Sequence, residues 1–185
     1  MSFFDSAPEF IELDNRQFRG VNPVSSEQME NKHEVLCPRS LIEGRTILDL
    51  GCCLGATGHW CLSHGAAQYT GIEVQKTYAD TARQLLEKYH PGKSEVLDIP
   101  IEQFLSQNTQ QYDVVLLLGV LYAFTDYYSI LQSVTDIARE IVIIESLYPN
   151  REQFDDEFCG VQFLKNQRIN LSDIHGSLYG RGTRI

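Results

Sequence analysis

The stretch "ILDLGCCLGATGHW" (residues 47–60) decides the fold, because it joins an apolar run, a glycine-rich turn and the start of a helical pattern. The apolar run has the composition of a buried strand, and Gly51 and Gly55 follow it closely. Gly51 allows a tight turn, and Gly55 lets the backbone approach a ligand. The N–H groups that open the next helix are donors for an oxygen-rich ligand. The stretch therefore predicts a ligand-binding turn between a strand and a helix.

Strand and helix patterns alternate from residue 44 onward. Apolar segments with strand composition lie at residues 45–50, 68–74, 94–99, 112–120 and 141–146. Segments with helical spacing lie between them, at residues 56–65, 76–90, 101–107 and 129–140. Strands that are apolar on both faces indicate a parallel sheet covered by helices on both sides, and right-handed crossovers make such a sheet doubly wound. The sequence therefore predicts an α/β fold with a doubly wound, mostly parallel, Rossmann-like sheet.

Three segments follow from this alternation. Residues 44–146 are the expected ligand-binding core. Residues 1–43 precede it as an N-terminal helical cap segment, in which one helix is expected at 26–36 after a serine N-cap. Residues 147–185 are polar and carry no strong strand pattern. We expect them to form a C-terminal extension, either a lid or a truncated remainder of the core.

The composition of the chain limits the classes of partner that it is expected to bind. The chain has 185 residues, is 43% hydrophobic and carries a net charge of -10. So acidic a surface repels a phosphate backbone and disfavours nucleic acid as a partner, which leaves a small molecule as the expected substrate. No apolar run approaches the roughly 18 residues of a membrane helix, and the N-terminus lacks the basic region of a signal peptide. A cytoplasmic protein is expected, and its oligomeric state is not indicated.

The chain contains five cysteines, Cys37, Cys52, Cys53, Cys61 and Cys159. An odd number in a cytosolic protein argues against a disulfide framework. Two adjacent cysteines are poorly spaced for a metal site, and no metal is expected. No cationic residue adjoins the pair in the turn to lower a thiol pKa. The cysteines are therefore interpreted as small, partly buried packing residues.

A dinucleotide-binding turn has the pattern G-x-G-x-x-G. Aligned on Gly51, the second glycine of that pattern falls on Cys53 and the third on Ala56, which is an accepted substitute. The Cys53 side chain stands where a pyrophosphate needs bare backbone. A nicotinamide-dependent oxidoreductase is therefore an alternative that this turn disfavours.

The nonapeptide "ILDLGCCLG" resembles motif I of the class I S-adenosylmethionine-dependent methyltransferases. That motif has an acidic residue, an apolar residue and then G-x-G-x-G, so Asp49, Gly51 and Gly55 match it. Cys53 departs from it at the second glycine, where the family accepts other small residues, and Cys52 stands where cysteine is frequent. The resemblance implies a Rossmann-like methyltransferase that uses S-adenosyl-L-methionine as its cofactor.

Later motifs continue the resemblance over residues 44–146. Glu73 ends the second strand pattern, where an acidic residue accepts both ribose hydroxyl protons. The resemblance implies that Asp98 accepts a hydrogen bond from the adenine amino group and that Ile99 packs on the ring. The whole cofactor site that it implies is Asp49, Gly51, Cys52, Gly55, Glu73, Asp98, Ile99, Leu118, Gly119 and Tyr122, with the last three near the methionine and the methyl group. Taken alone, Glu73 could be a solvated strand end and Asp98 a helix N-cap.

The catalytic residues are not identified by any motif. The cofactor carries an activated methyl group, so the protein must chiefly align the acceptor and exclude water. Some acceptors also need a general base, for which Tyr122, His33, Glu145 and His175 are the candidates. Each histidine could instead be structural.

Two alternatives stay open for the function. "GVLY" and "IEQFL" resemble the wobble-uridine tRNA carboxymethyltransferases, but Ala123 stands where those enzymes have histidine, and the chain is acidic. The family's sheet usually ends in an antiparallel pair of strands, which the residues after Ser146 do not resemble. These C-terminal strands are expected to be missing or atypical. A non-catalytic or truncated cofactor-binding module is therefore the alternative to a methyltransferase with a small-molecule acceptor.

Overall fold

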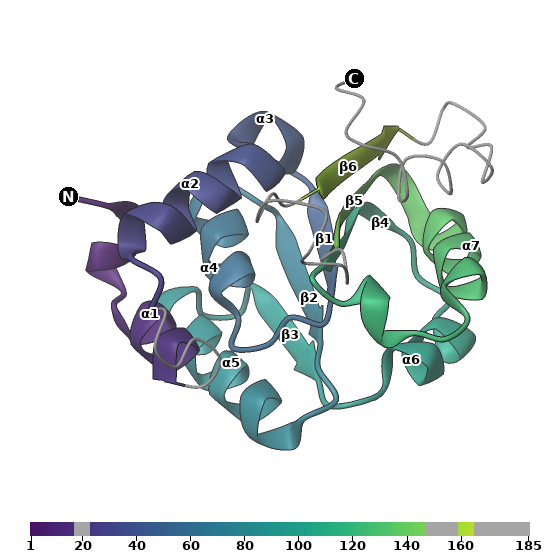
Figure 1. Ribbon diagram of the computed structural model, residues 1–185, viewed down its shortest axis with the longest axis horizontal. Coiled ribbons are helices and arrows are strands. Elements are labelled where there is room, and N and C mark those ends of the chain that lie inside the picture. The colour runs from purple at the N-terminus through teal and green to yellow at the C-terminus, as the bar shows by residue number, and fades with distance from the viewer. Residues whose placement is uncertain (17–22, 147–158, 165–185) are drawn as a thin grey trace, which may run out of the picture.

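The computed structural model describes residues 1–16, 23–146 and 159–164, the last of these for the backbone alone (Figure 1). Its strands form one sheet in the order β3-β2-β1-β4-β5-β6. They are β1 (Thr46–Leu50), β2 (Gln68–Ile72), β3 (Ser94–Leu97), β4 (Tyr112–Leu118), β5 (Ala138–Ser146) and β6 (Cys159–Leu164). Strands β1 to β5 are parallel, and strand order reverses between β1 and β4. The doubly wound, mostly parallel sheet is thereby confirmed, and the turn after β1 lies at the reversal point, where such sheets bind ligands.

Helices cover both faces of the sheet (Figure 1). The helices α4 and α5 lie on one face together with the N-terminal helices, and α6 and α7 lie on the other. The described helical elements are η1 (Phe3–Ser6), α1 (Glu9–Asp14), α2 (Ser26–Leu36), α3 (Arg39–Ile42), α4 (Ala56–Ser63), α5 (Lys76–Tyr89), α6 (Ile101–Gln107), η3 (Leu121–Ala123) and α7 (Tyr127–Ile137). None of these described helices is long and apolar enough to cross a membrane.

Neighbouring residues of the central strands enter different layers of the core. Ile47 and Leu116 pack with the N-terminal helices, α4 and α5, whereas Leu48 and Leu117 pack with α6 and α7. Side chains of a strand alternate between faces, so a strand buried on both faces has to be apolar throughout. This requirement is why the sequence pattern located all five parallel strands.

The N-terminal segment has more helices than the sequence predicted. The expected helix is α2, and its Ser25 side chain accepts from the Gln28 N–H at 3.2 Å in a capping box. The short helices η1 and α1 were not predicted, because so few residues show no periodicity. Their aromatic side chains pack on α4, with the Phe3 ring 5.0 Å from Trp60 and the Phe10 ring stacked 4.7 Å from His59.

The expected helix at 129–140 was wrong at both ends. Helix α7 starts at Tyr127 and stops at Ile137, and β5 begins at the next residue. Asp126 caps the helix by accepting from the Ser129 N–H at 3.1 Å. Ala138 is fully buried opposite Tyr112 of β4, so strand pairing takes over where the helical pattern still continued.

Strand β6 lies in the segment that showed no strong strand pattern, where the C-terminal strands were expected to be missing or atypical. It pairs antiparallel with β5 from Ile141↔Leu164 to Ser146↔Cys159. An uncovered β5 would expose a row of unpaired N–H and C=O groups, and β6 satisfies them. One antiparallel strand is thus present among the described residues, beside the five parallel strands.

Candidate functional site

The glycine turn between β1 and α4 has an unusual backbone. Gly51 has φ +91°, Cys53 φ +52° and Gly55 φ +85°, so three of five residues are left-handed. Cys53 is the one non-glycine residue with positive φ in the described part of the chain. A left-handed conformation costs an L-residue about 1–2 kcal/mol, which explains why glycine suits this position and a small side chain is tolerated.

Backbone hydrogen bonds tie this turn to β2. The N–H groups of Gly51 and Cys52 both donate to the Ile72 carbonyl, at 2.9 and 3.0 Å. The Cys53 N–H donates to Oε2 of Glu73 at 3.1 Å, and the Gln75 N–H donates to Oε1 at 2.8 Å. Glu73 is 9% exposed, so the interpretation as a solvated strand end is wrong. Each of its oxygens keeps an acceptor position for a further donor.

Asp49 lies beneath the turn rather than open to solvent. Its carboxylate accepts a hydrogen bond of 2.7 Å from the Tyr69 hydroxyl, and the residue is 2% exposed. Burial raises the pKa of Asp49 to about 6. Cys52 is also buried, and a Cβ at Gly71 would lie 2.6 Å from its Sγ. Both side chains therefore support the turn from the core of the fold.

Burial favours the protonated form of both thiols in the turn. Burial raises the pKa of Cys53 to about 12 and raises that of Cys52 well above its usual range. A thiol that stays protonated at neutral pH is neither a nucleophile nor a ready metal ligand. Within the described residues, no group of three or more histidine, cysteine or acidic side chains could hold a metal ion.

A second pair of residues follows the neighbouring strand. Ile72 of β2 pairs with Leu97 of β3, so Glu73 and Asp98 leave the sheet side by side. Asp98 is exposed, and its carboxylate lies 3.9 Å from Lys76 Nζ and 3.9 Å from the Arg83 guanidinium. It does not cap α6, whose N-cap residue is Pro100.

Val74 was missed by the sequence reasoning. It directly follows Glu73, and its apolar side chain is 62% exposed at the carboxyl edge of the sheet. The sequence pattern placed Val74 inside the second expected strand, residues 68–74, so its exposure was not predicted. Together with half-buried Ile99, it supplies apolar surface beside the two carboxylates.

The segment after β4 comes back onto the glycine turn. A Cβ at Gly51 would lie 3.2 Å from the Val120 side chain, so these two residues are in close contact. Gly119 has φ +68°, and its N–H donates to the Glu145 carbonyl at 2.8 Å. Tyr122 is 59% exposed in η3. Leu118, at the end of β4, pairs with Glu145 of β5.

The candidate bases differ in their environment. Glu145 is 1% exposed, and Lys32 of α2 places its Nζ 2.9 Å from Oε2. Neither Glu145 oxygen receives a hydrogen bond of acceptable geometry from the described residues. Glu145 and Tyr122 thus lie at the carboxyl edge of the sheet, whereas His175 falls outside the described residues.

His33 is a structural residue. It is buried, with Nδ1 2.7 Å from the Met29 carbonyl and Nε2 3.1 Å from Thr57 Oγ1. Burial lowers its pKa to about 4. Because both ring nitrogens have partners inside the fold, neither is free to take a proton from a substrate.

The sequence and the fold of this chain are similar to those of known proteins. A family profile described as "Methyltransferase domain" matches residues 48–140, half of the chain. The chain belongs to this methyltransferase family. The matched region contains the glycine turn, Glu73, Asp98 and the segment after β4.

Individual relatives are distant. A protein of Haemophilus influenzae described as "Uncharacterized protein" is 24% identical over 118 residues, covering 63% of this chain and 46% of that protein. The chain thus spans less than half the length of this curated relative. A structure of a conserved hypothetical protein from Streptococcus pyogenes has a TM-score of 0.60 at 13% identity, covering 72% of this chain and 92% of that one.

Coclaurine N-methyltransferase, bound to N-methylheliamine and SAH, has a TM-score of 0.59 at 16% identity, covering 70% of this chain and 39% of that one. At such identities these structures show a shared fold. The family profile over residues 48–140 and this shared fold together confirm the expected resemblance to the Rossmann-like methyltransferases.

The turn of this methyltransferase domain generates a paired prediction. Gly51→Val adds a β-branched side chain at φ +91° and against Val120, and should lower the free energy of unfolding by at least about 2 kcal/mol. Cys53→Gly relieves the strain of the left-handed backbone but raises the conformational entropy of the unfolded chain. These effects oppose each other, so the free energy of unfolding should change by no more than about 1 kcal/mol. Urea unfolding measures both. A loss of stability in Cys53→Gly as large as that in Gly51→Val would contradict the interpretation of Cys53 as a small side chain that the turn merely tolerates.

His33 generates a pH prediction. Between pH 6.5 and about 4 the unfolded chain protonates His33 and the folded chain does not, so acidification removes stability. The loss through His33 should reach about 2 kcal/mol at about pH 5 relative to neutral pH. Asp49, whose pKa is raised to about 6, partly offsets it, since acid favours the folded state through that group.

Urea unfolding of the His33→Gln variant at both pH values isolates the histidine. Its acid loss should be smaller than that of the unmodified chain by about 2 kcal/mol. Thr57→Val removes the partner of Nε2 but keeps the titrating ring, so it should retain the larger acid loss. An identical pH dependence in His33→Gln and the unmodified chain would rule out His33 as the source.

Proposed function

We propose that this chain binds S-adenosyl-L-methionine at the glycine turn and transfers its methyl group to a small-molecule acceptor. The observation that carries the proposal is the left-handed turn after β1, held beside the Glu73 carboxylate at the reversal point of the sheet. Membership of the methyltransferase family supports methyl transfer as the chemistry.

The residues present fit an adenosyl group. Glu73 keeps one acceptor position on each oxygen, as a pair of ribose hydroxyls requires. Exposed Val74 and half-buried Ile99 are apolar surfaces on which an adenine ring would pack. Asp98 has an exposed carboxylate beside them, suited to accept from the adenine amino group.

The methionine end is assigned to the segment after β4. Leu118 ends β4, Gly119 and Tyr122 follow it along this segment, and Val120 contacts Gly51. When bound, the cofactor supplies a methyl group activated by its sulfonium. The net charge of -10 attracts a cationic sulfonium over long range.

The role of the protein in the transfer is alignment and exclusion of water. Where the acceptor must lose a proton, Glu145 and Tyr122 are the groups that we propose to accept it. The net charge of -10 favours a small acceptor over nucleic acid. The Cys53 side chain at the second position of the turn disfavours a pyrophosphate and hence a nicotinamide cofactor.

Thermal unfolding tests the choice of cofactor. S-adenosylmethionine or its demethylated product at about 100 times Kd should stabilise the folded chain by about 2.7 kcal/mol and raise Tm by a few degrees. NAD and NADP at equal concentration should leave Tm unchanged. A shift with NAD and none with S-adenosylmethionine would overturn the proposal. Binding without methyl transfer to a panel of small acceptors would instead identify a cofactor-binding module.

Substitution of Glu73 tests the ribose contact. Glu73→Ala removes hydrogen bonds to a charged acceptor, which contribute about 1.5–3 kcal/mol. Calorimetry with the demethylated product should show affinity reduced about ten- to a hundredfold. Glu95→Ala, at an exposed position on β3, is the matched control and should bind as the unmodified chain does. Unchanged affinity in a folded Glu73→Ala chain would remove Glu73 from the site.

A further inference from the structure

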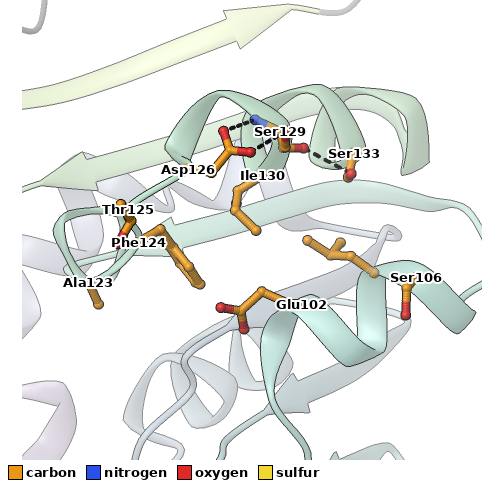
Figure 2. A pocket seen from close by; sticks show the side chains of 10 residues that line it. Glu102, Ser106, Ala123, Phe124, Thr125, Asp126, Ser129, Ile130 and Ser133 are labelled. Carbon is orange, nitrogen blue, oxygen red and sulfur yellow. Dashed lines mark hydrogen bonds between the residues drawn. The ribbon is translucent and has the colours of Figure 1, made fainter.

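A pocket of 410 Å³ opens between α6 and α7, on the face of the sheet opposite α4 (Figure 2). The loop that runs from η3 to α7 closes one side of it. None of its lining residues belongs to the proposed cofactor site, and its volume lies within the range of small-molecule sites. The residues that line it are Glu102, Leu105, Ser106, Ala123, Phe124, Thr125, Asp126, Ser129, Ile130 and Ser133.

The inner part of this pocket is apolar. Ile130 is buried, and Leu105 and Phe124 are half-buried side chains that pack against the core layer under α6 and α7. Phe124 and Glu102 point into the same space from the loop and from α6 (Figure 2). A ligand that fills the pocket therefore needs an apolar body next to a polar end.

Three of the four hydroxyl groups that line the pocket, all except that of Thr125, already donate their protons within the protein. Ser129 Oγ donates to Asp126 Oδ2 at 2.7 Å, and Ser133 Oγ donates to the Ser129 carbonyl at 2.9 Å. Ser106 Oγ donates to the Gln103 carbonyl at 2.8 Å. A hydroxyl has one proton and two lone pairs, so each of these groups offers a ligand only acceptor positions.

Two carboxylates, those of Glu102 and Asp126, also line the pocket and add negative charge to it. Hydrogen bonds from the Ser129 N–H and hydroxyl hold the pKa of Asp126 below its usual range, so it is ionised. Glu102 makes no hydrogen bond or ion pair with the described residues, and no lysine or arginine lines the pocket. The N-termini of α6 and α7 offset part of this charge but supply no mobile cation.

We propose that this pocket binds a small organic ammonium ion with an apolar or aromatic body, the ammonium lying at Glu102 and the body against Phe124 and Ile130. An ammonium group carries three donors and no acceptor, which matches a rim made chiefly of acceptors. The net charge of -10 adds long-range attraction for a cation. The proposal concerns binding at α6 and α7 and does not rest on methyl transfer.

Amide NMR with 2-phenylethylamine as the probe tests the pocket in the whole chain. The amine should shift the amides of Ser129, Ile130 and Ser133 and saturate at millimolar concentration or below. 2-Phenylethanol, which has the same body without charge, should bind several-fold more weakly, and 3-phenylpropionate should not bind. Raising the ionic strength should weaken binding of the amine, because salt screens the charge of the partly exposed carboxylates. Shifts confined to the glycine turn, or no saturation by the amine, would overturn the proposal.

Variants separate charge from shape. Glu102→Gln keeps the size of the side chain and should lower the affinity for the amine about three- to tenfold. This is the effect expected when a partly exposed charged hydrogen bond is lost. Glu95→Gln, at an exposed position on β3 outside the pocket, is the matched control and should bind the amine unchanged. Glu102→Gln should also leave the thermal shift by S-adenosylmethionine intact, which makes the two sites separable. Equal binding of the amine and the alcohol, or an unaffected Glu102→Gln, would show that the charge has no role.

Discussion

Three successive N–H groups of the glycine turn are held by the end of β2, two by the Ile72 carbonyl and one by the Glu73 carboxylate. These bonds fix where the chain leaves β1 and where α4 begins. The left-handed residues, including strained Cys53, are stable only because these acceptors over-determine the turn. Val120 then packs on Gly51, so the position of the segment after β4 also depends on the same bonds.

The elements that produce a local sequence pattern could be predicted from the sequence. Parallel strands such as β1 and β4 are buried on both faces, and their apolar runs have no other explanation in a chain of this size. Gly51 and Gly55 were recognisable because only glycine adopts their backbone angles without strain. Glu73 was a candidate ribose ligand because of its place at a strand end, and that role stays a prediction.

Features that depend on tertiary contacts were not predictable. Helices η1 and α1 are held by aromatic packing on α4, which no local periodicity reveals. Strand β6 exists because β5 needs a partner, and the end of α7 is set by the pairing of Ala138 with Tyr112. In the sequence His33 could be either a candidate base or a structural residue, and its partners prove to be a carbonyl one helical turn away and Thr57 of another helix. Only coordinates distinguish such a histidine from a catalytic one.

The Lys32–Glu145 pair has no explanation in stability alone. Removing a carboxylate from water is costly, and replacing a buried ion pair by well-packed apolar side chains of the same volume is often at least as stable. Here the carboxylate is 1% exposed and lacks hydrogen bonds of good geometry from the described residues, so the cost is poorly offset. Glu145 is the penultimate residue of β5 and pairs with Leu118, at the edge where the glycine turn lies. A carboxylate that Lys32 balances, kept in this position at the expense of stability, is consistent with a functional role at the edge where the cofactor is proposed to bind.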